Sequence, residues 1–174
     1  MGYRELFLVL ASVVLLTLLM TQINSNTVEG REALQQLEME HTATAIAQQF
    51  IEEAKAKKFD GNVGMVDASD PHNFTPYDQL AAGGWESYPN FNDIDDYNNL
   101  SRTVYVNGES FEPDSTNGIP FNVSIKVQYV SEAKPDSSVL DETYLKRMTV
   151  TVKSAYIPDS VRVKHVFSYY GVNF

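Results

Sequence analysis

The feature that most constrains this chain is an uncharged, strongly apolar segment close to its N-terminus. Residues 6–20 read LFLVLASVVLLTLLM, and the apolar run with its flanks extends from Tyr3 to Ile23. A helix needs about 20 predominantly apolar residues to cross the hydrocarbon core of a bilayer. We therefore predict an N-terminal helical segment, within residues 1–26, that requires lipid or an equally apolar protein environment.

A cleaved secretory signal peptide is the first alternative for this segment. Signal peptides combine a basic start, a short apolar stretch and a cleavage site of small residues. Here Arg4 is followed directly by Glu5, and the sequence after Met20 is TQINSNTVEG, which has no Ala-x-Ala site. We therefore expect no cleavage after the apolar segment.

Composition and motifs exclude several classes of function. The formal net charge is −10, and a surface that binds nucleic acid needs clustered Lys and Arg, so we expect no nucleic-acid partner. The absence of cysteine excludes disulfides and thiolate chemistry. His41, His72 and His165 are scattered, and no nucleophile-elbow or P-loop pattern is present, so we do not expect an enzyme.

Residues 27–59 predict a second, amphipathic helix after the polar stretch TQINSN. One side carries a stripe of residues at spacings of three to five, typical of a helix packed on a core. We expect His41, which lies on this side, to be an interior or edge residue rather than a ligand. Gly30 is a weak point at which the helix would melt locally in a closely packed assembly. The stripe consists of Leu34, Leu37, His41, Ile46, Phe50 and Ala54.

Residues 60–100 predict a long irregular loop, because Gly and Pro interrupt every periodic pattern there. The loop carries eight acidic residues and neither Lys nor Arg. Loops of this length inside a compact domain are uncommon and often functional. Its aromatic residues are expected mainly to pack in a core or an interface, since aromatic side chains bury large areas, with stacking against sugars as the alternative.

Residues 101–174 predict a four-stranded antiparallel sheet with one buried face. Apolar and polar residues alternate with period two, and segments around 117–120, 135–138 and 158–159 have the composition of turns. The buried row would pack on the stripe of the helix, which makes the fold class α+β. The expected strands are residues 103–106, 121–129, 147–154 and 161–169.

Taken in order along the chain, these features resemble the mature form of type IV pilins and their pseudopilin relatives. The resemblance lies in Glu5, the apolar stretch, the long amphipathic helix, the segment FNDIDDYNNL (91–100) before the sheet, and the strand LKRMTVTVKS (145–154). It implies the type IV pilin fold, with a long N-terminal helix packed on a four-stranded antiparallel sheet and residues 60–100 as the αβ-loop.

The resemblance also implies a function and its partners. A prepilin peptidase would remove a leader and methylate Met1, and an inner-membrane assembly machinery would build a homopolymer. Glu5 would neutralise the N-terminal amine of a neighbouring subunit, since two unlike charges in an apolar bundle cancel when subunits are in register. The chain would lie in the inner-membrane bilayer before assembly and in an extracellular surface filament afterwards.

The residues leave several alternatives open. Glu5 can also be an interfacial carboxylate that pairs with Arg4. The chain can be a minor pilin or adhesin, a type II secretion pseudopilin, or a single-pass membrane protein that does not polymerise.

Two further sets of residues, in the predicted globular head formed by residues 27–174, are candidate sites. Asp93, Asp95 and Asp96 suggest calcium, because alternating oxygen ligands suit this cation, although their spacing is not that of an EF-hand and a solvated or turn-capping acidic edge is the alternative. Asn-x-Ser/Thr triplets make three asparagines candidates for glycosylation in an exported protein, although such triplets also arise by chance in an Asn-rich chain. They are Asn73, Asn99 and Asn122.

Overall fold

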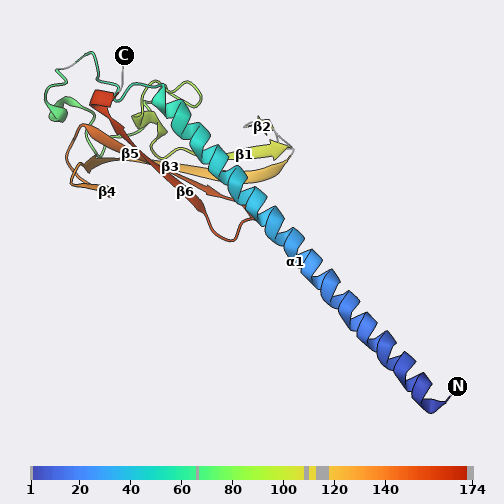
Figure 1. The fold of residues 1–174 in the computed structure, drawn as a ribbon. Helices are drawn as coiled ribbons and strands as arrows, with labels where there is room; N and C mark the ends of the chain where they lie inside the picture. Colours follow the sequence, from blue (N-terminus) through green and yellow to red (C-terminus); the bar gives the residue numbers. More distant parts are fainter. Residues whose placement is uncertain (1, 66, 108–109, 113–117, 172–174) are drawn as a thin grey trace. The chain divides into compact units, whose positions relative to one another are not determined.

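The computed structural model describes residues 2–65, 67–107, 110–112 and 118–171. The chain forms two compact units, residues 1–39 and residues 40–174, and each is considered by itself below. The helix α1 (Tyr3–Lys55) contributes to both units (Figure 1). Met1, the predicted processed N-terminus, lies outside the described residues.

The apolar and the amphipathic segment form one continuous helix, as the expected long N-terminal helix requires. The polar stretch after Met20 is helical, and its threonine hydroxyls bond to backbone carbonyls one turn earlier: Thr21 to Leu18 (2.8 Å) and Thr27 to Ile23 (2.8 Å). This bonding satisfies polar side chains inside a helix, so poor helix formers did not break it. α1 ends at Lys55, four residues before the predicted end.

The second unit contains an antiparallel sheet, which confirms the α+β class. In the described residues it has six strands, in the order β2-β1-β3-β5-β6, with β4 paired to the far end of β3. The strands are β1 (Ser101–Asn107), β2 (Ser110–Glu112), β3 (Ile119–Ser131), β4 (Lys134–Ser138), β5 (Leu145–Lys153) and β6 (Val161–Ser168).

The predicted count of four strands was therefore too low. Residues 135–138, predicted as a turn, belong to β4, whose five side chains are all exposed. A strand with no buried face shows no alternation, and its sequence KPDSS has low strand propensity. β4 forms because the end of β3 offers unpaired backbone groups, with Val130 opposite Ser138 and Ser131 opposite Lys134.

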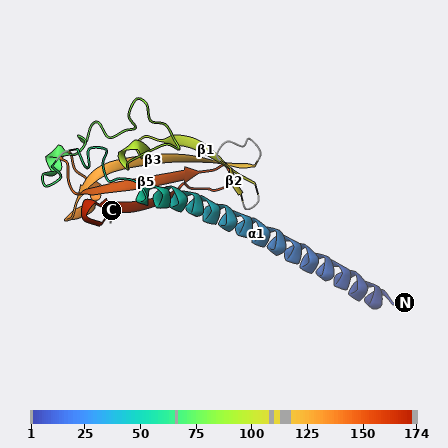
Figure 2. The ribbon, with the colours of Figure 1, turned by 90° about the horizontal axis from the view of Figure 1, so that it is seen from above.

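The core of this unit lies between the sheet and the last four turns of α1 (Figure 2). Alternate residues of β3 and β5 are buried, as the period-two pattern predicted. The helix contributes residues from Ala43 onward, and its three buried alanines leave room for the backbone to approach the sheet. The earlier members of the predicted stripe, Leu34, Leu37 and His41, are exposed. The buried helix residues are Ala43, Ile46, Ala47, Phe50, Ile51 and Ala54.

The segment between α1 and β1 is irregular, as predicted, but it is packed. It contains the short 3-10 helices η1 (Pro71–Asn73) and η2 (Asp95–Tyr97). Asn98 fastens it to the sheet, because its side-chain oxygen accepts from Val127 N at 2.9 Å and its nitrogen donates to Leu80 O at 2.6 Å. Most of its large apolar side chains are buried, which supports the packing interpretation of the aromatic residues; the buried ones are Phe59, Phe74, Leu80, Phe91, Ile94 and Tyr97.

Candidate functional site

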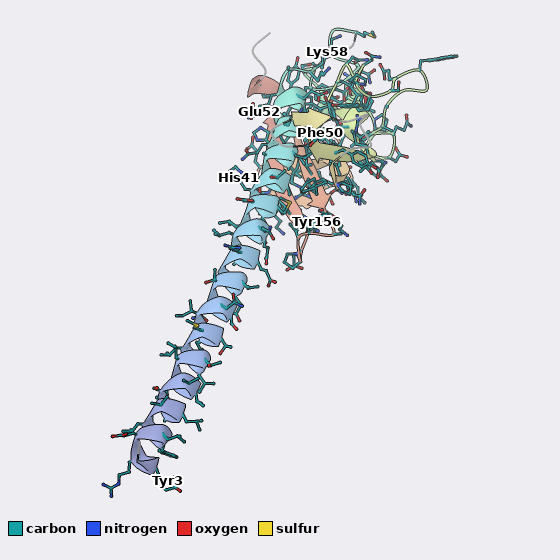
Figure 3. The ribbon with its side chains drawn as sticks, turned by 90° about the vertical axis from the view of Figure 1, so that its right-hand side faces the viewer. Tyr3, His41, Phe50, Glu52, Lys58 and Tyr156 are labelled. Atoms are coloured by element: carbon teal, nitrogen blue, oxygen red, sulfur yellow. The ribbon has the colours of Figure 1, made fainter. Side chains whose placement is uncertain are left out.

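The apolar half of α1 is the first candidate site, because nothing in its own unit covers it. By length and composition this helix can cross a membrane, and none of its most apolar 18-residue window is buried. Figure 3 shows side chains projecting from every side of the helix between Tyr3 and His41. Burying apolar surface is worth about 25 cal/mol per Å². A contiguous exposed patch of this kind therefore needs a lipid or protein partner. Its large apolar residues between Leu6 and Met20 are about half exposed or more, from Val14 at 52% to Phe7 at 70%.

Glu5 lies in the first turn of α1 and is exposed. Its backbone N–H donates to Gly2 O at 2.9 Å, so the helix is formed at this point. A carboxylate in the first turn is favoured by the helix dipole. Consecutive residues point to different sides of a helix, so Arg4 does not face Glu5 across the surface of the same helix. The geometry thus leaves the Glu5 carboxylate available to a group outside its own helix.

Gly30 lies within the unbroken helix. A Cβ built at this glycine would meet no heavy atom within 4 Å. The structure therefore gives no packing reason for glycine here, and local melting at Gly30 in an assembly stays a prediction.

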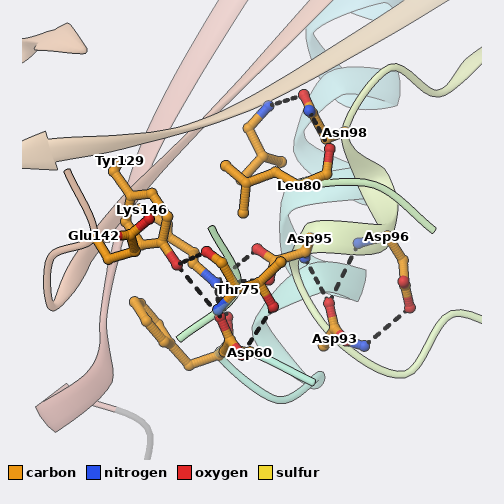
Figure 4. A network of polar contacts seen from close by, with 12 residues as sticks. Asp60, Thr75, Leu80, Asp93, Asp95, Asp96, Asn98, Tyr129, Glu142 and Lys146 are labelled. Carbon is orange, nitrogen blue, oxygen red and sulfur yellow. Dashed lines mark hydrogen bonds and ion pairs between the residues drawn. The ribbon is translucent and has the colours of Figure 1, made fainter. Parts of the chain in front are cut away.

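The second candidate site is a buried polar network around Lys146 (Figure 4). Lys146 occupies an inward position of β5 and is fully buried. Its ammonium donates to Phe59 O at 3.0 Å and to Asp60 Oδ2 at 2.7 Å, and it lies 2.7 and 2.8 Å from the two carboxylate oxygens of Asp95. Three acceptor groups thus match the three hydrogens of the ammonium. The contacts join the end of α1, η2 and β5 at one point.

Asp60 is the most fully hydrogen-bonded member of this network. Its oxygens accept from Asn62 N (2.9 Å), Thr75 N (2.8 Å) and Thr75 Oγ1 (3.1 Å), and the Tyr129 hydroxyl lies 3.3 Å away. Burial alone would raise the pKa of Asp60. The charge of Lys146 and the hydrogen bonds outweigh burial, so the pKa of Asp60 lies below its usual value. Asp60 is therefore the ionised partner of Lys146.

Asp95 has the opposite electrostatic balance. Its burial raises the pKa of the carboxyl group to about 8, although the charge of Lys146 acts against this rise. The nearby negative charge of Asp60 adds to the increase. Since one cation cannot fully neutralise two buried carboxylates, the pKa of Asp95 is raised whereas the pKa of Asp60 is lowered. The network thus stabilises the head chiefly through the Lys146–Asp60 pair.

The structure brings Asp93, Asp95 and Asp96 into one turn without arranging them as metal ligands. Asp93 Oδ1 accepts from Asp95 N at 2.7 Å, and Asp96 Oδ2 accepts from Asn92 N at 2.9 Å. Burial and the neighbouring Asp96 raise the pKa of Asp93 to about 6. The described residues contain no group of three His, Cys, Asp or Glu that could hold a metal ion. These hydrogen bonds fit the turn-capping alternative, and calcium at these three residues stays a prediction.

Sequence reasoning missed Asp60 and Lys146 as partners. Lys146 carries a detectable signal, because it takes an inward position in a strand whose other inward residues are apolar, Met148, Val150 and Val152. A charged residue at such a position requires a buried partner. Nothing in the sequence around Asp60 indicates that it pairs with Lys146. Asp60 lies in an irregular segment, 86 positions before its partner.

The three candidate glycosylation sites are all exposed, and their modification stays a prediction. Asn73 lies in η1, where its side-chain nitrogen donates to Asp67 O at 2.8 Å. Asn122 points outward from β3 and accepts from Thr103 Oγ1 at 2.9 Å. Asn99 has a positive φ of 64° just before β1.

The histidines lie in separate places. His41 is exposed on α1, contrary to the interior or edge position expected for it. His72 is exposed beside Asp70, 2.8 Å away, and the hydrogen bond to this carboxylate raises the pKa of His72. His165 packs edge-on against Phe167, and burial lowers the pKa of its ring.

The comparisons with known proteins add no family to these observations. Searches against protein-family models, curated proteins and solved structures found no match. The resemblance to type IV pilins remains a prediction from the sequence.

Proposed function

We propose that this chain is the structural subunit of a type IV pilus-like surface filament. The observation that carries the proposal is the uncovered apolar half of α1, on a helix whose last turns form the core of an α+β head. A fully apolar helix surface needs burial on all sides, which many parallel copies in a bundle provide. The heads would then cover the outside of the bundle.

The apolar segment would have two environments in succession. Before assembly it lies in the bilayer, for which its length is sufficient. After assembly it lies in the filament interior among copies of itself. Hydrophobic burial favours both states over water.

Glu5 would set the register of the assembly. A carboxylate at membrane depth costs a few kcal/mol unless it is neutralised. Residues i and i+1 do not face each other on a helix, so in this proposal the compensating cation comes from a neighbour rather than from Arg4. In this proposal that cation is the N-terminal amine of the adjacent subunit.

The test compares Glu5→Gln with Glu29→Gln, a matched change at another exposed carboxylate of α1. We expect Glu5→Gln to abolish or strongly reduce the protein that can be sheared from intact cells, while its amount in the membrane fraction is unchanged. Glu29→Gln should behave as the unmodified chain. Filaments from Glu5→Gln in normal yield would refute the role of Glu5.

The candidate membrane span also fits an alternative function, a single-pass membrane protein that does not polymerise. Mass spectrometry of the N-terminal peptide distinguishes this alternative from the filament subunit. A methylated N-terminal residue in the sheared fraction supports a processed filament subunit. An unmethylated Met1 confined to the membrane fraction supports the single-pass protein instead. Stoichiometry in purified filaments distinguishes a major subunit from a minor pilin.

A further inference from the structure

The face of the sheet opposite the core carries a concentration of positive charge. It consists of the outward side chains of β3, β5 and β6, and we call it the outer sheet face. Five of the chain's 13 Lys and Arg residues lie on it, in a chain of net charge −10. Between them are Ser, Thr, Asn and Gln side chains. The five cationic residues are Lys126, Arg147, Lys153, Arg162 and Lys164.

The strand register brings these charges close together. Thr149 pairs with Lys126 on one side and with Lys164 on the other, and Thr151 pairs with Arg162 in the next row. Adjacent strands are about 4.8 Å apart, so the Lys126 and Lys164 backbones are separated by about 10 Å. This is somewhat more than the Debye length of about 8 Å at physiological salt, so the repulsion between these exposed side chains is largely screened. The face still presents an excess of positive charge to an anionic group.

A groove of about 590 Å³ runs over this face. Its described lining includes Lys126, Arg147, Arg162 and Lys164 and no acidic residue. Two of these cations already have partners: Lys164 pairs with Asp136 of β4 at 2.9 Å, and Arg147 donates to Pro135 O at 2.9 Å. Lys126 and Arg162 are exposed and form no ion pair with any described residue. Half of the cations in the groove are thus available to an external anion.

The same head exposes negative charge elsewhere. In the loop between α1 and β1, Asp67, Asp70 and Asp78 are exposed, whereas the carboxylates near Lys146 are buried. One molecule therefore carries two surfaces of opposite sign on different elements. Contact between two different surfaces of identical subunits is heterologous, and repeated heterologous contacts generate open helical polymers.

We propose that the outer sheet face binds the acidic loop of a second copy of this chain. This inference deepens the proposed function, because the contact would join neighbouring heads in the filament. Charge complementarity of this kind fixes which surfaces meet and suppresses wrong pairings. Lys126 and Arg162 would be the principal contacts to the loop carboxylates of the neighbour.

The experiment uses full-length chains in cells and measures the yield of sheared filaments. The face-reversed variant carries Lys126→Glu and Arg162→Glu, and the loop-reversed variant carries Asp70→Lys and Asp78→Lys. The matched control carries Lys55→Glu and Lys134→Glu, which makes the same change in net charge at exposed lysines outside both the groove and the acidic loop. The thermal unfolding midpoint of each purified variant verifies that the head is folded.

We expect each reversed variant alone to reduce the filament yield about tenfold or more, because like charges then meet at the contact. Co-expression of the two reversed variants should restore filaments, and the control should assemble normally. A face-reversed variant that assembles like the control would overturn the proposal. So would a loss of filaments that the loop-reversed partner does not restore.

Two further readouts keep the test decisive. If the reversed variants unfold, the neutral variant Lys126→Gln with Arg162→Gln is used. We expect high salt to lower the yield of unmodified filaments and to change the yield of the neutral variant much less. Filaments that assemble normally but no longer bind heparin beads would assign the face to a polyanion and refute the second-copy contact. Absence of filaments from the unmodified chain would instead refute the proposed function itself.

Discussion

The network around Lys146 gives the sharpest test of the structural reasoning, because its two carboxyl groups should respond differently to the same substitution. Asp60→Asn and Asp95→Asn each replace one buried carboxyl by an amide of nearly equal size. Both carboxyl oxygens of Asp60 accept hydrogen bonds, whereas Asp95 faces little except the ammonium of Lys146. The two variants thus remove the same charge from different environments.

The expected loss for Asp60→Asn follows from what the amide leaves behind. The amide nitrogen must face either the N–H groups of Thr75 and Lys146 or the N–H group of Asn62, and it can accept from none of them. Breaking a buried ion pair by removing one partner costs about 3–5 kcal/mol. We expect a decrease of that size in the free energy of unfolding. Asp95→Asn should cost clearly less, since burial raises the pKa of this carboxyl and fewer hydrogen bonds hold it than hold Asp60.

The pH dependence of the two variants differs in sign. The folded-state pKa of Asp95 is raised from 3.8 to about 8, so its contribution to stability is present below about pH 4 and is lost as the pH rises toward 8. Asp95→Asn removes this loss. The free energy of unfolding of the variant should therefore rise relative to that of the unmodified chain as the pH increases from 4 to 8. The folded-state pKa of Asp60 is lowered, so its contribution is present above pH 4 and is lost as the pH falls further. The penalty of Asp60→Asn should therefore shrink in acid.

Urea titration of the full chain in mild detergent, followed by far-ultraviolet circular dichroism at pH 5 and pH 8, measures these free energies. Asp93 and Asp96 also titrate, and Asp93 interacts with Asp95, so the double variant Asp93→Asn with Asp95→Asn is compared with Asp93→Asn at the same pH. Equal losses for the two variants at pH 8 would refute the division of roles. The difference in free energy of unfolding between Asp95→Asn and the unmodified chain should depend on pH. If it is the same at pH 5 and pH 8, the raised pKa of Asp95 is refuted.

Two glycines give simpler predictions. Gly118 has a φ of +133°, and a Cβ there would lie 2.5 Å from Val106 O, so Gly118→Ala should lower the free energy of unfolding by about 2 kcal/mol or more in the same urea titration. Gly30→Ala meets no obstruction and should stabilise the helix by about 1 kcal/mol, measured as helical content of the chain in detergent. If the helix melts at Gly30 in the filament, Gly30→Ala should also lower the filament yield, because Ala opposes melting. An unchanged yield would refute local melting at Gly30.

Hydrophobic periodicity predicted much of the fold. The alternation in residues 121–129 and 148–152 identified the buried rows of β3 and β5, because one-face burial imposes period two on a strand. The stripe from Ile46 to Ala54 identified the helix face that packs on them. The same reasoning failed for β4, whose exposed residues follow no pattern. In the stretch after Met20 the helix continues despite weak local propensity.

The candidate sites divide along a similar boundary. Glu5 is recognisable from the sequence because it interrupts an apolar run, which is a local property. The acidic cluster at Asp93–Asp96 is also recognisable from the sequence. Its role is not, because the cation that contacts it, Lys146, lies far along the chain. The outer sheet face was invisible before the strand register was known, because its cations come from three strands.

The sequence by itself therefore determined the apolar helix, the α+β class and the position of Glu5, because each depends on residues within one segment. Only the tertiary structure decided which charges meet. The ion pair of Lys146 with Asp60 joins residues 86 positions apart, and the groove over β3, β5 and β6 depends on a one-residue choice of register. Electrostatic interactions depend on distance in space, and only the folded chain fixes distances between segments.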